Sequence, residues 1–248
     1  TQIGSRPVLQ LAKSIGLPPM PDVPSLALGV GEATPLQLTA AYAVFPNGGF
    51  AVTVRPIVQV LDADGYAVFN QDVERTRVIS EAVAYQMVSM LADVVDAGTG
   101  AAVRSLGVRF PAGGKTGTTD AFKDAWFVGF SSSVVAGVWV GFDQPAPIGR
   151  DGYGARYALP IWADFMARAA RIRTPGAFSV PTTVEGVRLC RVSHLAAREA
   201  CPVYTEYFKR GDTVPEDKCD VHRGATAAEV IGTIFSRIGK GIGRIFGR

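Results

Sequence analysis

The stretch that decides the fold is Phe110 to Phe130, FPAGGKTGTTDAFKDAWFVGF. Its first half, AGGKTGTT, consists of small, β-compatible residues around one ammonium group, that of Lys115. Its second half, DAWFVGF, is an apolar run with β-branched and aromatic residues, which predicts a strand. The stretch therefore predicts two neighbouring strands, and it raises the question of what a lone charged amine does among residues so small.

The sequence on either side extends this sheet and supplies helices to cover it. A third apolar run, VVAGVWVGF, follows Ser131 to Ser133, and so short a connection favours an antiparallel neighbour. Asp64-Gly65 predicts a hairpin within residues 56–69. Helical spacing and end signals predict four helices, at Val8 to Gly16, Thr34 to Phe45, Ser80 to Ala97 and Ala158 to Ile172. The predicted fold class is α/β (α+β), an antiparallel sheet covered by helices.

The apolar stripes of two of these helices predict which faces pack on the sheet. For the helix from Ser80 the stripe is Val83, Met87, Met90, Leu91 and Val94. For the last helix it is Ile161, Trp162, Phe165, Met166 and Ala169. Glycines recur in the strands, at Gly129, Gly137 and Gly141, and a glycine within a strand indicates that another group packs closely over it.

Composition and charge narrow the class of protein. The chain has 248 residues and a net charge of +3, and residues 225–248 carry all of that excess. With no general basic face, nucleic acid is not an expected partner. The basic segment itself has apolar residues at helical spacing, which predicts an amphipathic helix for an anionic membrane surface. Circular dichroism of this peptide with anionic vesicles tests that prediction, and no gain of helix in lipid would remove it.

All three cysteines, Cys190, Cys201 and Cys219, lie in the last quarter of the chain. One disulfide with one thiol left over is compatible with this number, most simply Cys190 to Cys201, but the sequence does not choose the pairing. Their spacing fits no common zinc pattern, so no metal site is predicted. Neither histidine, His194 or His222, has a plausible triad partner, and both are expected on the surface.

Gly-Lys-Thr invites a phosphate-loop interpretation, which the neighbouring residues exclude. A phosphate loop needs glycine six residues before its lysine, and Arg109 stands there. A helix must also begin at the lysine, whereas a turn and a strand are predicted instead. The alternative is a strand that lines a cleft. Side chains alternate along it, with Lys115, Gly117 and Thr119 on one side and Thr116 and Thr118 on the other. An ammonium and hydroxyls on a strand of small residues suit a peptide that is held by its C-terminal carboxylate.

The Lys115-Thr116-Gly117 triplet followed by Thr118-Thr119 resembles the K-T-G box of the penicillin-recognising serine enzymes. Five ordered blocks carry the resemblance further: PSLALGVGEATPLQLTAAYAVFPNGG, GTGAAV, GGKTGTTDAFKDAWFVGF, VWVGFD and ALPIWADFM. Together they resemble class A high-molecular-weight penicillin-binding proteins over about residues 1–181. The resemblance implies the β-lactamase-like fold of serine transpeptidases, incomplete here at its N-terminal side.

The resemblance also implies roles for the residues of the box. Lys115 would raise the local positive potential and orient a proton relay, and the amide of Thr118 would be one oxyanion-hole donor. Thr116, Gly117, Thr118 and Thr119 would contact the substrate. The two hydroxyls of Thr116 and Thr118 would bind the terminal carboxylate of a D-Ala-D-Ala stem peptide or of a β-lactam. No metal or cofactor is implied.

The family's nucleophile motif, S-x-x-K, and its S-x-N motif do not occur in this sequence. Both precede Thr1 in the family's order, so an upstream part of the same protein is expected to supply the serine. The implied activity is that of a peptidoglycan D,D-transpeptidase, which also carries a glycosyltransferase in class A relatives. The alternatives are a D,D-carboxypeptidase or β-lactamase-type hydrolase, and a non-catalytic peptide-binding module of the same fold.

Three regions are expected along the chain. Residues 1–178 would be the C-terminal portion of the transpeptidase domain, residues 179–224 a cysteine-containing extension, and residues 225–248 the basic amphipathic tail. The resemblance places the protein at the extracytoplasmic, periplasmic face of a bacterial cytoplasmic membrane, held there by an upstream anchor.

Overall fold

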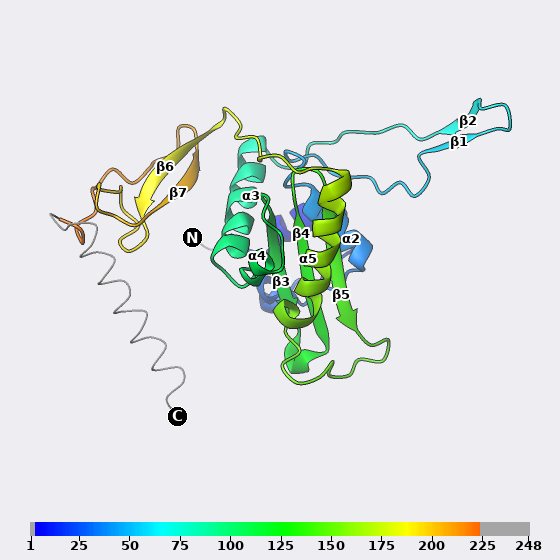
Figure 1. Cartoon of the computed structure of the whole chain (residues 1–248), viewed down its shortest axis with the longest axis horizontal. Helices are drawn as coiled ribbons and strands as arrows, with labels where there is room; N and C mark the ends of the chain where they lie inside the picture. The colour runs from blue at the N-terminus through cyan, green and yellow to red at the C-terminus, as the bar shows by residue number, and fades with distance from the viewer. Residues whose placement is uncertain (1–2, 224–248) are drawn as a thin grey trace. The chain divides into compact units, whose positions relative to one another are not determined.

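The computed structural model describes residues 3–223, so the predicted amphipathic tail lies outside the described residues. The chain divides into two compact units, Thr1–Pro181 and a second unit that begins at Thr182 (Figure 1). The helices of the first unit are α1 (Ser5–Ser14), η1 (Pro24–Leu28), α2 (Pro35–Ala43), α3 (Glu81–Asp96), α4 (Ala102–Ser105), η2 (Asp120–Phe122) and α5 (Gly154–Ile172). Its strands are β1 (Gln59–Leu61), β2 (Ala67–Asn70), β3 (Gly113–Thr118), β4 (Asp124–Phe130) and β5 (Val135–Gly141).

The central sheet has three strands in the order β3-β4-β5, and both pairings are antiparallel as predicted. Lys115 lies opposite Val128, and Val128 in turn lies opposite Gly137. In the described part of the chain, β3 and β5 are therefore the outer strands of an open sheet. Fold class and partial domain agree with the sequence analysis.

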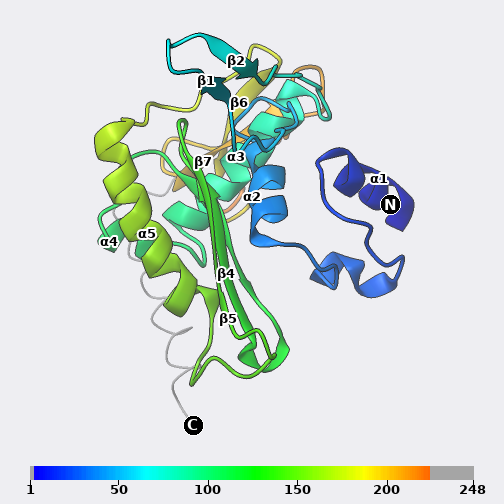
Figure 2. The ribbon, with the colours of Figure 1, turned by 90° about the vertical axis from the view of Figure 1, so that its right-hand side faces the viewer.

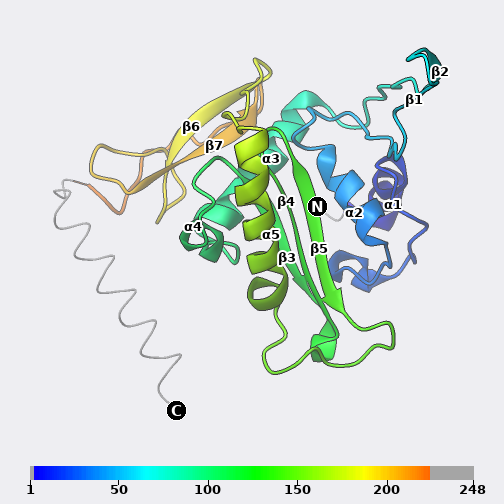
Figure 3. The ribbon, with the colours of Figure 1, turned by 45° about the vertical axis from the view of Figure 1, so that its right-hand side comes forward.

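Helices cover both faces of this sheet, with α5 on one side and α2 on the other (Figures 2 and 3). Glycines in the strands make room for them. A Cβ on Gly129 would come within 2.7 Å of the buried Trp162 ring of α5. On the other face, a Cβ on Gly137 would collide with the hydroxyl of Thr39 in α2. The predicted close packing over these strand glycines is confirmed.

Local signals place the starts of α2 and α3 as the sequence predicts. Thr34 caps α2 in a reciprocal arrangement with Gln37, and Pro35 occupies the first helical turn, where its missing N–H costs nothing. The hydroxyl of Ser80 accepts from the amide of Val83 at the start of α3. The hairpin at Asp64-Gly65 is also present, as β1 paired with β2.

The predicted stripes of α3 and α5 are wrong in part. In α3, Val83 and Met90 are exposed, and the buried side chains are Ala82, Ala84, Val88, Leu91 and Val95. In α5, Ile161 and Phe165 are exposed, and the buried residues other than Trp162 and Met166 are Gly154, Ala158, Leu159 and Ala163. Because both helices are apolar on more than one face, periodicity does not decide which face meets the sheet.

Within residues 3–223, none of the helices has both the length and the apolar character needed to traverse a bilayer.

The second unit contains an antiparallel pair of strands, β6 (Val184–Cys190) and β7 (Val203–Lys209). All three cysteines are free thiols and are buried. His222, which was expected on the surface, is only 6% exposed. The expectation was wrong because the chain after β7 returns to β6, where Ala196 bridges to Lys218 and brings His222 among the cysteines.

Candidate functional site

The strand β3 presents the predicted box along the outer edge of the sheet. Its first two residues, Gly113 and Gly114, are buried, whereas Lys115 and Thr118 are exposed. The ring of Phe130 packs directly against Gly113, so closely that a Cβ there would lie 2.8 Å from it. The strand is thus fixed in the core at its start and open to solvent where its charged and hydroxyl side chains lie.

Side chains of the box alternate between the two faces of the sheet. Thr118 lies on the face of α5, because its Oγ1 accepts a hydrogen bond of 3.1 Å from the amide of Gly154, the first residue of that helix. Lys115 is an odd number of positions away and therefore faces the side of α2 and α3. The predicted division of the box into two sets is confirmed.

The bond to Gly154 determines what the Thr118 hydroxyl can do. A hydroxyl has one hydrogen to donate and two lone pairs that accept. The helix amide uses one lone pair, so the hydroxyl hydrogen remains available to an acceptor such as a carboxylate. Gly154 has to be glycine, because a Cβ would collide with the carbonyl of Trp126 and lie 2.6 Å from that of Gly117.

Thr116 is held by a residue that the sequence analysis did not single out. Its Oγ1 lies 3.0 Å from the Oγ1 of Thr99, and either oxygen can be the donor. Thr99 stands in the GTGAAV block, in the turn between α3 and α4. The contact fixes the Thr116 side chain beside the strand edge. A threonine in a turn gives no sequence signal of this role, so Thr99 could not be identified from the sequence.

The main chain of β3 also has a defined direction. The amide of Thr119 donates to the carbonyl of Asp124 in β4 at 3.2 Å. Main-chain groups alternate in direction along a strand, so the amide of Thr118 and the amide and carbonyl of Thr116 point to the open edge. The ammonium of Lys115 lies at that same edge, where its Nζ donates to the Thr116 carbonyl at 2.9 Å.

Thr119 belongs to the turn and not to the strand edge. Its Oγ1 donates to Oδ2 of Asp124 and accepts from the Asp124 amide, both at 2.9 Å. The turn that follows is tight, since Ala121 and Phe122 both have positive φ angles. The Thr119 hydroxyl thus closes the β3–β4 connection, with both its donor and one of its acceptor positions in use.

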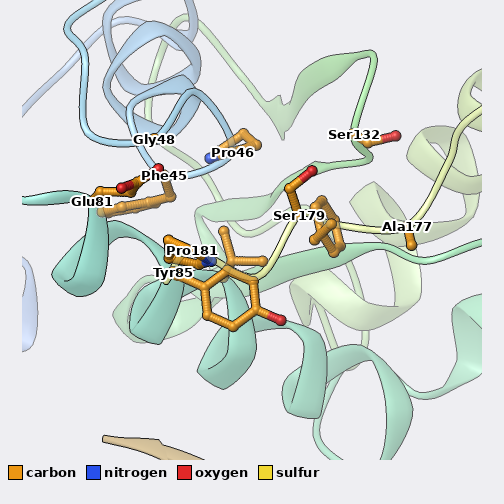
Figure 4. Close-up of a pocket in the computed structure, with 11 residues that line it drawn as sticks. Phe45, Pro46, Gly48, Glu81, Tyr85, Ser132, Ala177, Ser179 and Pro181 are labelled. Atoms are coloured by element: carbon orange, nitrogen blue, oxygen red, sulfur yellow. The ribbon is translucent and has the colours of Figure 1, made fainter. Parts of the chain in front are cut away.

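Two cavities of the first unit lie elsewhere. The one in Figure 4 has a volume of about 200 Å³ and is bordered by the end of α2, by α3 and by the segment that ends at Pro181. Glu81 is the only charged residue in its lining, and a carboxylate does not attract another carboxylate. The other lies against Asp96, Arg104 and Arg109, where Arg104 is already paired with Asp96. Neither cavity is lined by the residues of the box.

Residues 13–167 match the family described as the penicillin binding protein transpeptidase domain. The chain belongs to that family. Residues 180–224 match a second family, described as the C-terminal domain of penicillin-binding protein 1A. The resemblance to penicillin-binding proteins, drawn first from the sequence blocks, is confirmed.

Known relatives of this transpeptidase-family chain are longer than it is. It is 38% identical over 218 residues to penicillin-binding protein 1A of Aquifex aeolicus, covering 88% of this chain and 30% of the relative. With the protein of the same name from Neisseria gonorrhoeae it is 41% identical over 175 residues, covering 68% of this chain and 21% of that one. The chain thus spans less than a third of either relative.

Solved structures of penicillin-binding proteins share the fold. That of penicillin-binding protein 1A from Haemophilus influenzae superposes with a TM-score of 0.77 at 26% identity, over 87% of this chain and 38% of that one. The PonA1 protein from Mycobacterium tuberculosis, solved in complex with penicillin V, has a TM-score of 0.57 at 25% identity, over 65% of this chain and 45% of that one.

Proposed function

We propose that residues 1–178 are the C-terminal portion of a penicillin-binding serine D,D-transpeptidase domain that cross-links peptidoglycan stem peptides. One observation carries the proposal: in a chain of this family, the ammonium of Lys115 and outward-facing main-chain groups lie at the open edge of β3, and the hydroxyls of Thr116 and Thr118 lie on the α5 face of the same strand. An upstream part of the same protein would supply the S-x-x-K and S-x-N motifs and close the cleft opposite this edge.

The edge suits a peptide that binds as an added strand. Its main chain would pair with the outward-facing groups of Thr116, and Gly117 would leave room for its approach. The terminal carboxylate would accept hydrogen bonds from the hydroxyls of Thr116 and Thr118, and Lys115 would supply the positive potential. The Thr119 hydroxyl is less available to contact the substrate, because it is already hydrogen-bonded to Asp124.

The same edge provides catalytic groups for acyl transfer. The upstream serine would attack the carbonyl of the penultimate D-Ala, and its proton would pass to the leaving D-Ala through a relay that Lys115 orients. The Thr118 amide would stabilise the oxyanion, and losing such a donor costs about 3–4 kcal/mol of transition-state stabilisation. An amine of a second stem peptide would then release the acyl group and complete the cross-link.

The hydrolytic alternatives use the same strand. In a D,D-carboxypeptidase or a β-lactamase, water takes the place of the acceptor amine, and a non-catalytic module would bind the peptide without reacting. The relatives named penicillin-binding protein 1A favour the transpeptidase. On the same ground we propose that the parent protein is bifunctional, with a glycosyltransferase and a membrane anchor upstream, and that it acts at the periplasmic face of the membrane.

The test is acylation of the full-length parent protein by fluorescent penicillin, followed by peptide mapping. Label should appear upstream of Thr1. Lys115→Ala should abolish labelling, and Thr118→Val should reduce it. The matched control is Lys123→Ala, which removes another exposed lysine, in the connection between β3 and β4. Label on a residue within 1–248, or full labelling of Lys115→Ala, would contradict the proposed site.

A second measurement separates the alternatives. With stem-peptide substrates, the transpeptidase should yield cross-linked dimers, whereas a carboxypeptidase should release D-Ala with no dimer. Absence of both products in a protein that carries S-x-x-K and S-x-N would leave only the binding module.

A further inference from the structure

A buried cluster in the second unit is independent of the proposed transpeptidase site. Cys190, Cys201, Cys219 and His222 each contribute one potential ligand atom, and all four atoms lie within 4.8 Å of one another. The sulfurs lie 3.4, 3.5 and 3.2 Å, in that order, from the Nδ1 of His222. Four soft or borderline ligands thus converge on one point inside the protein.

Hydrogen bonding alone does not account for this convergence. The Nδ1 of a neutral histidine carries either one N–H or one lone pair, so it can pair with only one thiol at a time. Three sulfurs nevertheless lie at nearly equal distances from it. Zinc in a tetrahedral site has Zn–S bonds of about 2.3 Å and Zn–N bonds of about 2.0–2.1 Å, which places sulfur and nitrogen about 3.5 Å apart. The observed distances match that spacing.

We propose that Cys190, Cys201, Cys219 and His222 bind one zinc ion. The set is Cys3His, one of the ligand combinations of structural zinc sites, and it fills all four positions of a tetrahedron. With no position left for water or substrate, the site holds the fold together and does not catalyse a reaction. Binding releases the three thiol protons to solvent.

The surroundings of the cluster suit the charge of such a site. Three thiolates and one Zn²⁺ carry a net charge of −1. Main-chain amides already point at the sulfurs, from Val192 to Cys190 at 3.4 Å and from Arg198 to Cys201 at 3.2 Å. The guanidinium of Arg198 donates to the Cys219 carbonyl at 2.6 Å and so brings a positive charge beside the site. These contacts orient the ligands and offset the negative charge.

The described part of the second unit has a small apolar core. In its described part, residues 182–223, the only buried aliphatic side chains are Val184 and Leu189, and the cysteines form the centre of its hydrophobic cluster. Chains this short bury too little apolar surface and usually depend on disulfides, metals or assembly. A single disulfide would join two of the cysteines and leave the third thiol and His222 with no comparable role.

The sequence analysis predicted no metal site because it relied on the spacing of the cysteines along the chain. The ligands follow Cys-x10-Cys-x17-Cys-x2-His, and only the last pair has the short separation of common zinc motifs. Cys190 and Cys201 come together because they flank the paired ends of β6 and β7, where Cys190 lies opposite Val203. Cys219 joins them through its amide, which donates to the Ala196 carbonyl at 2.9 Å.

The test uses protein that contains the full chain, purified with a thiol reductant and passed through a chelating resin. Elemental analysis should find about one zinc ion per chain, and cobalt exchange should give the visible absorption of tetrahedral thiolate coordination. Cys201→Ser combined with Cys219→Ser should lose both signals. The control is His194→Asn, which alters the only other histidine, and asparagine tolerates the positive φ of that position.

Each outcome decides the proposal. Wild-type protein without zinc, or with a Cys190–Cys201 disulfide found by non-reducing peptide mapping of material never exposed to oxidant, overturns it. Zinc that persists in the double variant is adventitious and overturns it as well. If the double variant does not fold, the cobalt spectrum of the wild-type protein decides, because only cysteine ligands produce sulfur-to-cobalt charge transfer.

Discussion

Replacing Gly154 by alanine tests how α5 positions the candidate site. A Cβ at this position would lie 2.6 Å from the Gly117 carbonyl and would collide with the Trp126 carbonyl. Real Cβ contacts below 3.0 Å are essentially unknown, so the start of α5 has to move by about 0.7 Å to clear the closer of the two carbonyl oxygens. Both obstacles are main-chain atoms of paired strands, which cannot rotate away.

The movement acts on the hydroxyl of Thr118. Its bond from the Gly154 amide is 3.1 Å long and stretches beyond the ordinary range of hydrogen bonds. Losing a bond of this kind costs about 0.5–1.5 kcal/mol, which corresponds to about a 2- to 10-fold slower acylation if the Thr118 hydroxyl binds the β-lactam carboxylate. The overpacking should lower the stability of the protein by about 1–3 kcal/mol.

The assay is the second-order rate of acylation by fluorescent penicillin in the full-length parent protein, with thermal unfolding measured in parallel. Gly176→Ala is the matched control, since a Cβ there meets nothing within 4 Å. The hydrogen bond that the Gly176 amide donates to the Ser132 hydroxyl is kept. A folded Gly154→Ala protein that reacts as fast as Gly176→Ala would refute the reasoning. It would mean that the orientation of Thr118 does not matter for binding the carboxylate.

Two further predictions concern the turn and the core. Thr119→Val removes the hydroxyl that bridges to Asp124, so it should destabilise the fold by about 0.5–1.5 kcal/mol in thermal unfolding while slowing acylation less than Thr118→Val does. The reverse order of acylation rates would assign substrate contact to Thr119. Gly129→Ala places a Cβ 2.7 Å from the Trp162 ring and 2.8 Å from the Gly113 carbonyl, so it should cost about 1–3 kcal/mol of stability by denaturant unfolding. An unchanged midpoint would show that α5 can shift freely over the sheet.

The elements whose ends are set by local chemistry could be predicted from the sequence. Thr34, Pro35 and Gln37 determine where α2 begins, because the first amides of a helix must find acceptors close by in the chain. Asp64-Gly65 determines the hairpin in the same local way. The alternation of the K-T-G strand also follows from sequence, since side chains of any strand point to opposite faces in turn.

Contacts between distant parts of the chain could not be predicted. Gly154 lies 36 positions after Thr118, and no pattern in the sequence links the two. The stripe predicted for α3 was wrong in part for the same reason: Val83 and Leu91 are both apolar, and only packing buries Leu91 and leaves Val83 exposed.

By itself, the amino-acid sequence determined the family, the strands around Lys115 and the starts of α2 and α3, because each depends on residues close together in the chain. Only the tertiary structure decided that Thr118 is held by α5 and that Thr119 belongs to a turn. It alone brought His222 into the interior beside the three cysteines. The physical reason is the same in each case: burial and ligand geometry arise from chain segments that meet in space, and their separation along the sequence carries no record of that meeting.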